Sequence, residues 1–268
     1  MSEKRVIILK CTIEYQNVYE RGSLLERQRS LRYIFFKHTL KSQEEFSMDL
    51  LQAMYARHSV RSYTERPIEG KTKEELVSFI EQCRRESGLH LQLVTDEPNA
   101  FNSFMAHYGN FSGVRNYIVL AGKKGKELEE TCGYYGEKIV LYAQTLGLNT
   151  CWVALTYSKG KTVFQLDPGE KLCLVIAVGY GTLEGVPHKT KPRESVMHTG
   201  QTPPDWFLRG IDAALLAPTA MNQQKFVFSL KGNTVTAKAG IGFYSKIDLG
   251  IAKYHFELGE GTENFRWG

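Results

Sequence analysis

The sequence has no long hydrophobic run and no closely spaced pair of cysteines. Its longest uninterrupted apolar run covers residues 172–178, well short of the roughly 20 residues that span a bilayer, so no membrane partner is predicted. The five cysteines occur without a CxxC pair, which argues against a zinc site or a disulfide framework and fits a reducing cytoplasm. They are Cys11, Cys83, Cys132, Cys151 and Cys173.

Charge of one sign is not in large excess either. The formal net charge is +5 over 268 residues, whereas a dedicated nucleic-acid binder would concentrate more basic residues. A modest positive charge instead suits an anionic small molecule. The rival interpretation is a basic surface protein that binds nucleic acid through the arginine-rich residues 21–32, with steep salt dependence. With 42% hydrophobic and 24% charged residues, the composition is that of a globular protein with a buried core.

Residues 1–47 differ in pattern from the rest of the chain. Residues 6–9 could form a short strand, but residues 24–41 are rich in arginine and aromatic residues without clean periodicity. We therefore interpret 1–47 as an N-terminal extension outside the core and 48–268 as the main domain. Residues 1–20 show no apolar stretch followed by a small-residue cleavage site, so we expect a cytoplasmic protein. Translation from Met48 would be an alternative explanation of the same boundary.

The main domain alternates helical and strand patterns. Apolar residues recur at helical spacing within 76–83, and Thr72 with Glu75 has the spacing of a capping box. A helix followed by a strand occurs twice, which suggests two half-units, 48–200 and 201–268. Helices are predicted at about 73–87, 134–146, 206–216 and 248–256, and strands at 89–93, 117–120, 150–155, 172–178, 226–228 and 235–237. The last two strands are predicted to form a hairpin around Gly232-Asn233.

A compact set of hydrogen-bond donors follows the first helical segment of the main domain. Arg57-His58-Ser59-Val60-Arg61 places two guanidiniums, a hydroxyl and an imidazole within five residues. Arginine presents a planar fork of N–H groups that suits a phosphate. The alternative is a solvated basic turn, where cations also complement the helix dipole. The candidate ligand-binding residues here are Arg57, His58, Ser59 and Arg61.

Two later segments carry groups that complement this motif. The basic stretch 188–193 contains Lys189 and Lys191, which form either an exposed loop or a second set of cations for an anionic ligand. Residues 217–224 follow a helix that a proline should end, and they are crowded with neutral donors and acceptors suited to the edge of a heteroaromatic ring. The candidates are Pro218, Thr219, Asn222 and Gln224, with Trp152 as an apolar wall.

A ligand with a phosphate, a polyol and a planar ring bearing carbonyls and nitrogens would match these groups. Flavin mononucleotide (FMN) has all three parts. The cations would neutralise its phosphate, and the Ser59 hydroxyl would contact the phosphate or the polyol. No residue is predicted to be a dedicated acid, base or nucleophile, and no metal ligands are predicted.

The same segments resemble the motifs of the nitroreductase-like flavoprotein family. Residues 57–61 are similar to its Arg-Arg-Ser-x-Arg motif, and residues 217–224 to its Ala-Pro-Ser-x-x-Asn-x-Gln loop. Residues 136–155 resemble its long helix, Leu-Gly-Leu turn and Thr-Cys-Trp strand, and residues 176–180 with the two lysines complete the likeness. Two features differ. His58 replaces the second arginine, and the loop comes about 155 residues after the first motif rather than close behind it.

The resemblance implies an α+β fold with a central, mainly antiparallel sheet surrounded by helices, and FMN near the interface of a homodimer or a pseudo-dimeric monomer. It also implies an oxidoreductase that passes electrons from NADH or NADPH through the flavin to a small-molecule oxidant such as a nitroaromatic or a quinone. Thr219, Asn222 and Gln224 would then lie along the ring. The alternative is a flavin- or nucleotide-binding protein with little turnover, such as a sensor or a store.

Overall fold

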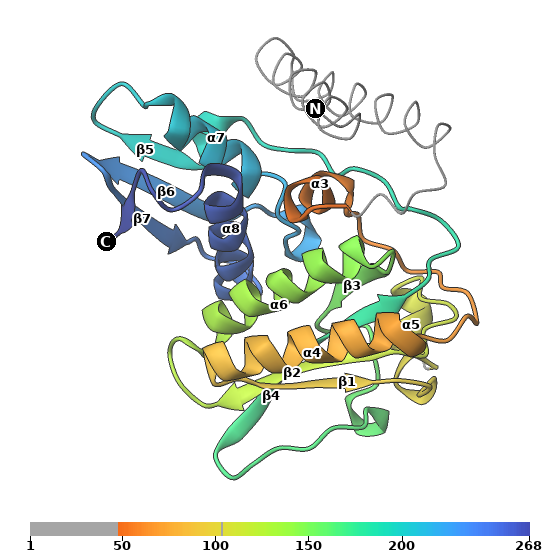
Figure 1. The fold of residues 1–268 in the computed structure, drawn as a ribbon. Helices are drawn as coiled ribbons and strands as arrows, with labels where there is room; N and C mark the ends of the chain where they lie inside the picture. Colours follow the sequence, from red (N-terminus) through yellow and green to blue (C-terminus); the bar gives the residue numbers. More distant parts are fainter. Residues whose placement is uncertain (1–47, 103) are drawn as a thin grey trace, which may run out of the picture. The chain divides into compact units, whose positions relative to one another are not determined.

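The computed structural model describes residues 48–102 and 104–268, which form helices packed with two four-stranded sheets (Figure 1). The expectations for residues 1–47 lie outside this part of the chain. Within the described residues, no helix is both long and apolar enough to cross a membrane. The α+β class and the mainly antiparallel pairing are confirmed.

The first sheet has the order β1-β2-β4-β3, and all of its pairs are antiparallel. Helices α4 and α6 cover one face of this sheet (Figure 1). Aromatic residues of the connecting segments, among them Phe101, Phe111 and Tyr157, pack against the other face. The elements are α3 (Leu50–Ala56), α4 (Gly70–Ser87), β1 (His90–Val94), η1 (Asn99–Phe101), α5 (Phe104–Tyr108), β2 (Tyr117–Lys123), α6 (Leu128–Thr145), β3 (Asn149–Val153), η2 (Lys159–Lys161) and β4 (Glu170–Gly179).

The second sheet has the order β5-β6-β7-β8. Strands β6 and β7 form the predicted antiparallel hairpin, whereas β5 and β8 each pair in parallel at the two edges. Because β5 begins before residue 200, a boundary at that residue would separate it from its partner β6; the division into half-units stays a prediction. The elements are η3 (Arg193–Ser195), β5 (Met197–Thr199), α7 (Asp205–Ala214), η4 (Ala220–Asn222), β6 (Phe226–Lys231), β7 (Thr234–Ala239), α8 (Ser245–Glu260) and β8 (Arg266–Trp267).

Two helix starts differ from the prediction. Helix α4 begins at Gly70 after the N-cap Glu69, so the spacing of Thr72 and Glu75 does not mark a capping box. Helix α6 begins at Leu128 rather than near residue 134. The apolar pattern missed its start because the first turn carries the polar residues Glu129, Glu130 and Thr131. Helix ends were better predicted, since Gly88 takes the left-handed conformation (φ 68°) that few other residues adopt readily.

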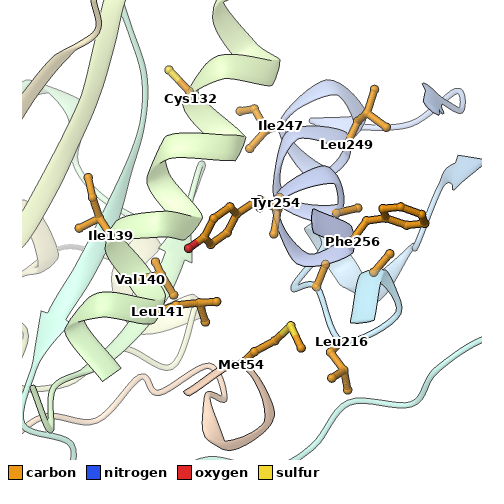
Figure 2. Packing of buried hydrophobic residues seen from close by; sticks show 14 of the residues in the cluster. Met54, Cys132, Ile139, Val140, Leu141, Leu216, Ile247, Leu249, Tyr254 and Phe256 are labelled. Atoms are coloured by element: carbon orange, nitrogen blue, oxygen red, sulfur yellow. The ribbon is translucent and has the colours of Figure 1, made fainter. Parts of the chain in front are cut away.

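The two sheets are joined through the packing of α6 against α8. A Cβ atom on Gly133 of α6 would overlap the backbone carbonyl of Ile247, and one on Gly250 of α8 would overlap the carbonyl of Glu130. The two helices therefore approach closely at glycines on both sides. Figure 2 shows the ring of Tyr254 between the same two helices. This contact sets where the elements of the first sheet meet those of the second.

Candidate functional site

The segment after α3 is extended and packs along β3. Arg57 has an extended backbone and caps α3 through its N–H bond to the Ala53 carbonyl. Ser59 forms an isolated parallel bridge with Thr150, and the Val60 N–H donates to the Thr150 carbonyl at 3.0 Å. The motif is therefore an ordered edge of the first sheet rather than a solvated turn.

The Arg57 side chain points into the protein. It is only 4% exposed. Its Nε lies 3.8 Å from Oε1 of Glu137 on α6, which makes a loose ion pair. Neither Nε nor Nη1 has a hydrogen-bond partner among the described residues. A buried guanidinium with unused donors is ready to bind an anion or another acceptor.

Glu137 is the centre of a buried polar network. One of its oxygens lies 2.8 Å from Nε2 of His255, and the other accepts a hydrogen bond from the Trp152 indole at 2.8 Å. Nδ1 of His255 lies 3.1 Å from the Ala213 carbonyl, so the imidazole bridges Glu137 and the backbone of α7. This network fixes the indole of Trp152, and Glu137 is completely buried beside Arg57.

The sequence analysis missed Glu137 and His255. The signal available was the position of Glu137 in the helical pattern, because it shares a face with Val140 and Leu141, which are completely buried. A charged residue on an apolar stripe indicates a buried partner. Nothing near His255 in the sequence points to that partner, since it lies 118 residues further along the chain.

The loop of residues 217–224 has an unusual backbone. Met221, Asn222 and Gln224 have φ angles of 53°, 52° and 42°. Non-glycine residues seldom take this left-handed conformation, and its clustering is typical of functional sites. The side chain of Gln224 is buried and holds the loop together, because its Nε2 donates to the Asn222 side chain at 2.7 Å.

Hydrogen bonds join this loop to both predicted lysines. The Lys189 carbonyl accepts from the side chains of Asn222 at 2.8 Å and Gln224 at 2.7 Å. The Lys191 N–H donates to the Gln224 side-chain oxygen, and its ammonium donates to the Gln223 carbonyl, both at 2.8 Å. The second and third predicted segments are thus brought together, with the lysine side chains exposed.

Asp248, in the first turn of α8, anchors the same loop. Its two oxygens accept from the Ala220 N–H at 3.0 Å and from the Gln223 side chain at 2.7 Å. Burial raises the pKa of Asp248 to about 6, although both hydrogen bonds act in the opposite direction. The loop is therefore held by hydrogen bonds to a carboxyl group whose charge changes under mildly acidic conditions.

Residues 185–189 connect the first motif to the loop. A Cβ atom on Gly185 would lie 2.9 Å from the Cβ of His58 and from the Ser59 carbonyl oxygen, so the two segments touch there. His188 donates from Nε2 to the Leu215 carbonyl at 2.9 Å. Burial lowers the pKa of His188, and the positive charge of Arg57 lowers it further. The first motif thus lies next to the segment that carries the lysines.

Arg61 has a different environment. It is exposed, and its guanidinium lies 5.9 Å from the centre of the Phe111 ring. Burial raises the pKa of the Cys151 thiol, while Arg61, Arg57 and a hydrogen bond from Ser59 act against that rise. The guanidinium of Arg61 therefore lies beside Phe111, which belongs to the cluster on the far face of the first sheet.

Pro218 and Thr219 belong to the first part of the 217–224 loop, after α7. Both are half-buried. Helix α7 ends at Ala214, close to the end that Pro218 predicts. The Thr219 hydroxyl oxygen accepts from the Gln224 N–H at 3.1 Å.

A separate group of possible metal ligands lies at the start of β4. In the described part of the chain, His90, Asp167 and Glu170 have potential ligand atoms within 4.8 Å of one another. Glu170 already accepts from the His90 side chain at 2.7 Å and from the Asp167 N–H at 2.8 Å. These hydrogen bonds account for the cluster without an ion.

Comparison with known proteins identifies the family. A family model described as "Putative TM nitroreductase" matches residues 49–260, about four fifths of the chain. The chain belongs to this family. The predicted likeness to nitroreductases is thereby confirmed. No curated protein sequence matches the chain.

One solved structure supports the same fold. The structure of a "putative nitroreductase" from Thermotoga maritima matches 82% of this chain and 87% of its own, with a TM-score of 0.57 and 22% sequence identity. A "putative NADH dehydrogenase/NAD(P)H nitroreductase" from Parabacteroides distasonis matches 57% of this chain and 98% of its own (TM-score 0.44, 23% identity). A "putative nitroreductase in complex with FMN" from Desulfovibrio desulfuricans matches 57% and 96% (TM-score 0.44, 18% identity).

Proposed function

We propose that this chain binds FMN and acts as an NADH- or NADPH-dependent oxidoreductase on a small-molecule oxidant, such as a nitroaromatic or a quinone. The observation that carries the proposal is the buried guanidinium of Arg57, whose Nε and Nη1 have no hydrogen-bond partner among the described residues and whose Nε makes only a loose ion pair with Glu137. Leaving such donors unpaired costs about 1–3 kcal/mol, and a bound anion would remove that cost. Membership of a nitroreductase family supports the same redox activity.

The phosphate would lie where the first motif meets the lysine segment. Arg57 and Ser59 come from the edge of the first sheet, and Gly185 packs against His58 and Ser59. Lys189 and Lys191 would add positive charge from the other side. Arg61 is the fourth cation proposed for the phosphate. It lies in the same region as Arg57, since both positive charges oppose the rise in the pKa of the Cys151 thiol.

The ring would lie along the 217–224 loop. The side-chain amide of Gln224 is used by hydrogen bonds to Asn222 within the loop and to the backbone of Lys189 and Lys191, so its role is to hold the loop against the lysine segment. Thr219 and Asn222 would present polar groups to the ring edge, and Pro218 and Trp152 would provide apolar surface. Because Glu137 accepts a hydrogen bond from the Trp152 indole, the orientation of the indole is already fixed before FMN binds.

When bound, FMN supplies electron transfer between a nicotinamide donor and the oxidant. The chain's own residues bind and orient it. Cations at the phosphate would control how well it is retained, and polar groups along the ring would favour a more negative ring over a neutral one. We assign no protein nucleophile and no proton donor. The packing of α6 against α8 within one chain supports a pseudo-dimeric monomer, with a homodimer as the alternative.

The phosphate assignment is tested by titrating the protein with FMN. We expect Lys189→Ala and Lys191→Ala each to weaken FMN binding, because each removes a cation near the phosphate. Lys161→Ala is the matched control, since Lys161 is an exposed lysine in η2. Equal FMN affinity in all three variants and the parent protein would contradict the assignment.

The ring assignment is tested with Asn222→Ala. We expect this variant to retain FMN but to shift its reduction potential and turnover, because Asn222 would contact the ring and not the phosphate. An FMN potentiometric titration gives the shift directly. If potential and turnover stay the same, Asn222 serves only to hold the loop through its hydrogen bonds with the Lys189 carbonyl and the Gln224 side chain.

A further inference from the structure

The pairing of β2 with β4 contains a bulge at a cysteine. Leu120 pairs with Leu174, but the next residue of β2, Ala121, pairs with Leu172. Cys173 is therefore an extra residue in β4 that has no partner across the ladder. Side chains normally alternate between the two faces of a sheet, and an extra residue of this kind turns a side chain to the opposite face.

The bulge turns Cys173 toward the helices. Leu172 packs against the hydrophobic cluster on the far face of the sheet, whereas Cys173 and Leu174 both pack against the cluster that includes α6. The completely buried Cys132 lies on α6 between Leu128 and Gly136, one helical turn from each. A Cβ atom on Gly122 of β2 would touch Leu128, and one on Gly136 would touch Leu120 of β2, so Cys132 faces β2 and β4 at the bulge. Figure 2 shows Cys132 on the side of α6 that faces away from Ile247. Two thiols far apart in sequence thus meet between helix and sheet.

The two sulfurs have unequal environments. Cys173 is partly exposed, and Lys171 lies two residues before it. The interaction with Cys132 lowers the pKa of Cys173, and the Lys171 charge acts in the same direction. The interaction with Cys173, followed by burial, raises the pKa of Cys132. Cys173, the more exposed of the two, is therefore the more reactive thiol.

We propose that Cys132 and Cys173 form a redox-active dithiol that a hydroperoxide converts into a disulfide between α6 and β4. The Cys173 sulfur attacks the terminal peroxide oxygen, the O–O bond breaks, and the alcohol or water leaves with a proton; Cys173 becomes a sulfenic acid. The Cys132 sulfur then attacks the Cys173 sulfur and releases water. Two thiols and one hydroperoxide thus give one disulfide, one alcohol or water, and one further water.

The disulfide would tie the bulge to the helix that carries Glu137. Glu137 lies five residues after Cys132 on α6, and it holds both Trp152 and His255. Oxidation would therefore restrain the element that supports the buried Arg57. The chemistry of the dithiol itself does not depend on whether FMN binds.

The experiment treats the folded full-length chain with hydrogen peroxide, blocks the remaining thiols, and maps the digested peptides by mass spectrometry. We expect a cross-linked pair of peptides containing residues 132 and 173, with the loss of two free thiols, and recovery of both on reduction. Cys83 and Cys151, which are also buried, should stay unlinked. Free Cys132 and Cys173 after oxidation, or a link to another cysteine, would overturn the proposal.

Variants separate the two roles. Cys132→Ser should leave Cys173 as a sulfenic acid that a dione probe traps, whereas Cys173→Ser should leave Cys132 unoxidised. Cys83→Ser is the matched control, since it should form the cross-link as the parent chain does. Trapping on Cys132 in place of Cys173 would contradict the assignment of the attacking thiol, and a melting curve checks that each variant is folded.

Discussion

Arg57 is the residue on which the phosphate assignment depends. We expect Arg57→Ala to lower FMN affinity by about 10- to 100-fold, because it removes a charge-assisted contact of about 1.5–3 kcal/mol. FMN titration of the folded variant measures the change.

The control is Arg84→Ala, because Arg84 is an exposed arginine on α4 that pairs only with Glu81 among the described residues. It should leave FMN affinity unchanged. Since Arg57→Ala also removes the cation beside Glu137, a circular dichroism melt must establish that the variant is folded. Unchanged affinity in folded Arg57→Ala would exclude the guanidinium from the phosphate site.

Asp248 makes the stability of the protein depend on pH. Its folded-state pKa is raised to about 6 from an ordinary value of 3.8. The folded protein thus holds a proton that the unfolded chain has lost, and stability falls as the pH rises from about 4 to about 6. Relative to Asp248→Asn, the parent chain should lose up to about 3 kcal/mol across that interval. Urea unfolding of both proteins at several pH values measures the difference; parallel profiles would contradict it.

At the level of residues, the sequence predicted several polar residues that line the candidate site. It did not predict the buried charged and histidine side chains that hold them in place. Asn222, Gln224 and the two lysines are brought together as the pattern suggested. Glu137, Asp248 and His255 were not predicted, because a buried polar residue is recognised by its partners and these come from distant elements. Local pattern cannot supply such partners.

At the level of elements, the close approach of α6 and α8 depends on glycine. We expect Gly133→Ala to lower the free energy of unfolding by about 1–3 kcal/mol, because its methyl group would overlap the Ile247 carbonyl and force the helices apart. Urea denaturation measures the loss. Gly160→Ala is the matched control, since a Cβ there meets nothing within 4 Å, and it should change stability by less than about 0.5 kcal/mol. Equal stability of both variants would contradict this account of the packing.

The types of most elements could be predicted from the sequence, whereas some boundaries could not. Apolar spacing gave α4, α6 and α7 their type, and Gly232 with Asn233 predicted the β6–β7 turn. The first turns of α6 were missed because they continue the helix with few apolar residues. The short edge strands β5 and β8 were missed because they form only by pairing with β6 and β7.

At the level of the whole molecule, the division of the strands into two sheets was not predicted. It depends on α6 and α8 packing against each other between the sheets, which is a contact between residues more than 100 positions apart (Figure 1). The same packing brings segments 57–61, 185–191 and 217–224 into one region. The altered order of the motifs is therefore compatible with a shared site, because the loop reaches the first motif through the lysine segment.

The most direct test of the central claim is a visible absorption spectrum of the full-length protein after incubation with FMN and removal of free flavin. The account predicts that flavin stays bound, that NADH or NADPH bleaches its absorption in the absence of oxygen, and that a nitroaromatic or a quinone restores it. Bound flavin that neither nucleotide reduces would instead point to a binding protein with little turnover. Failure of the protein to retain any flavin would contradict the account.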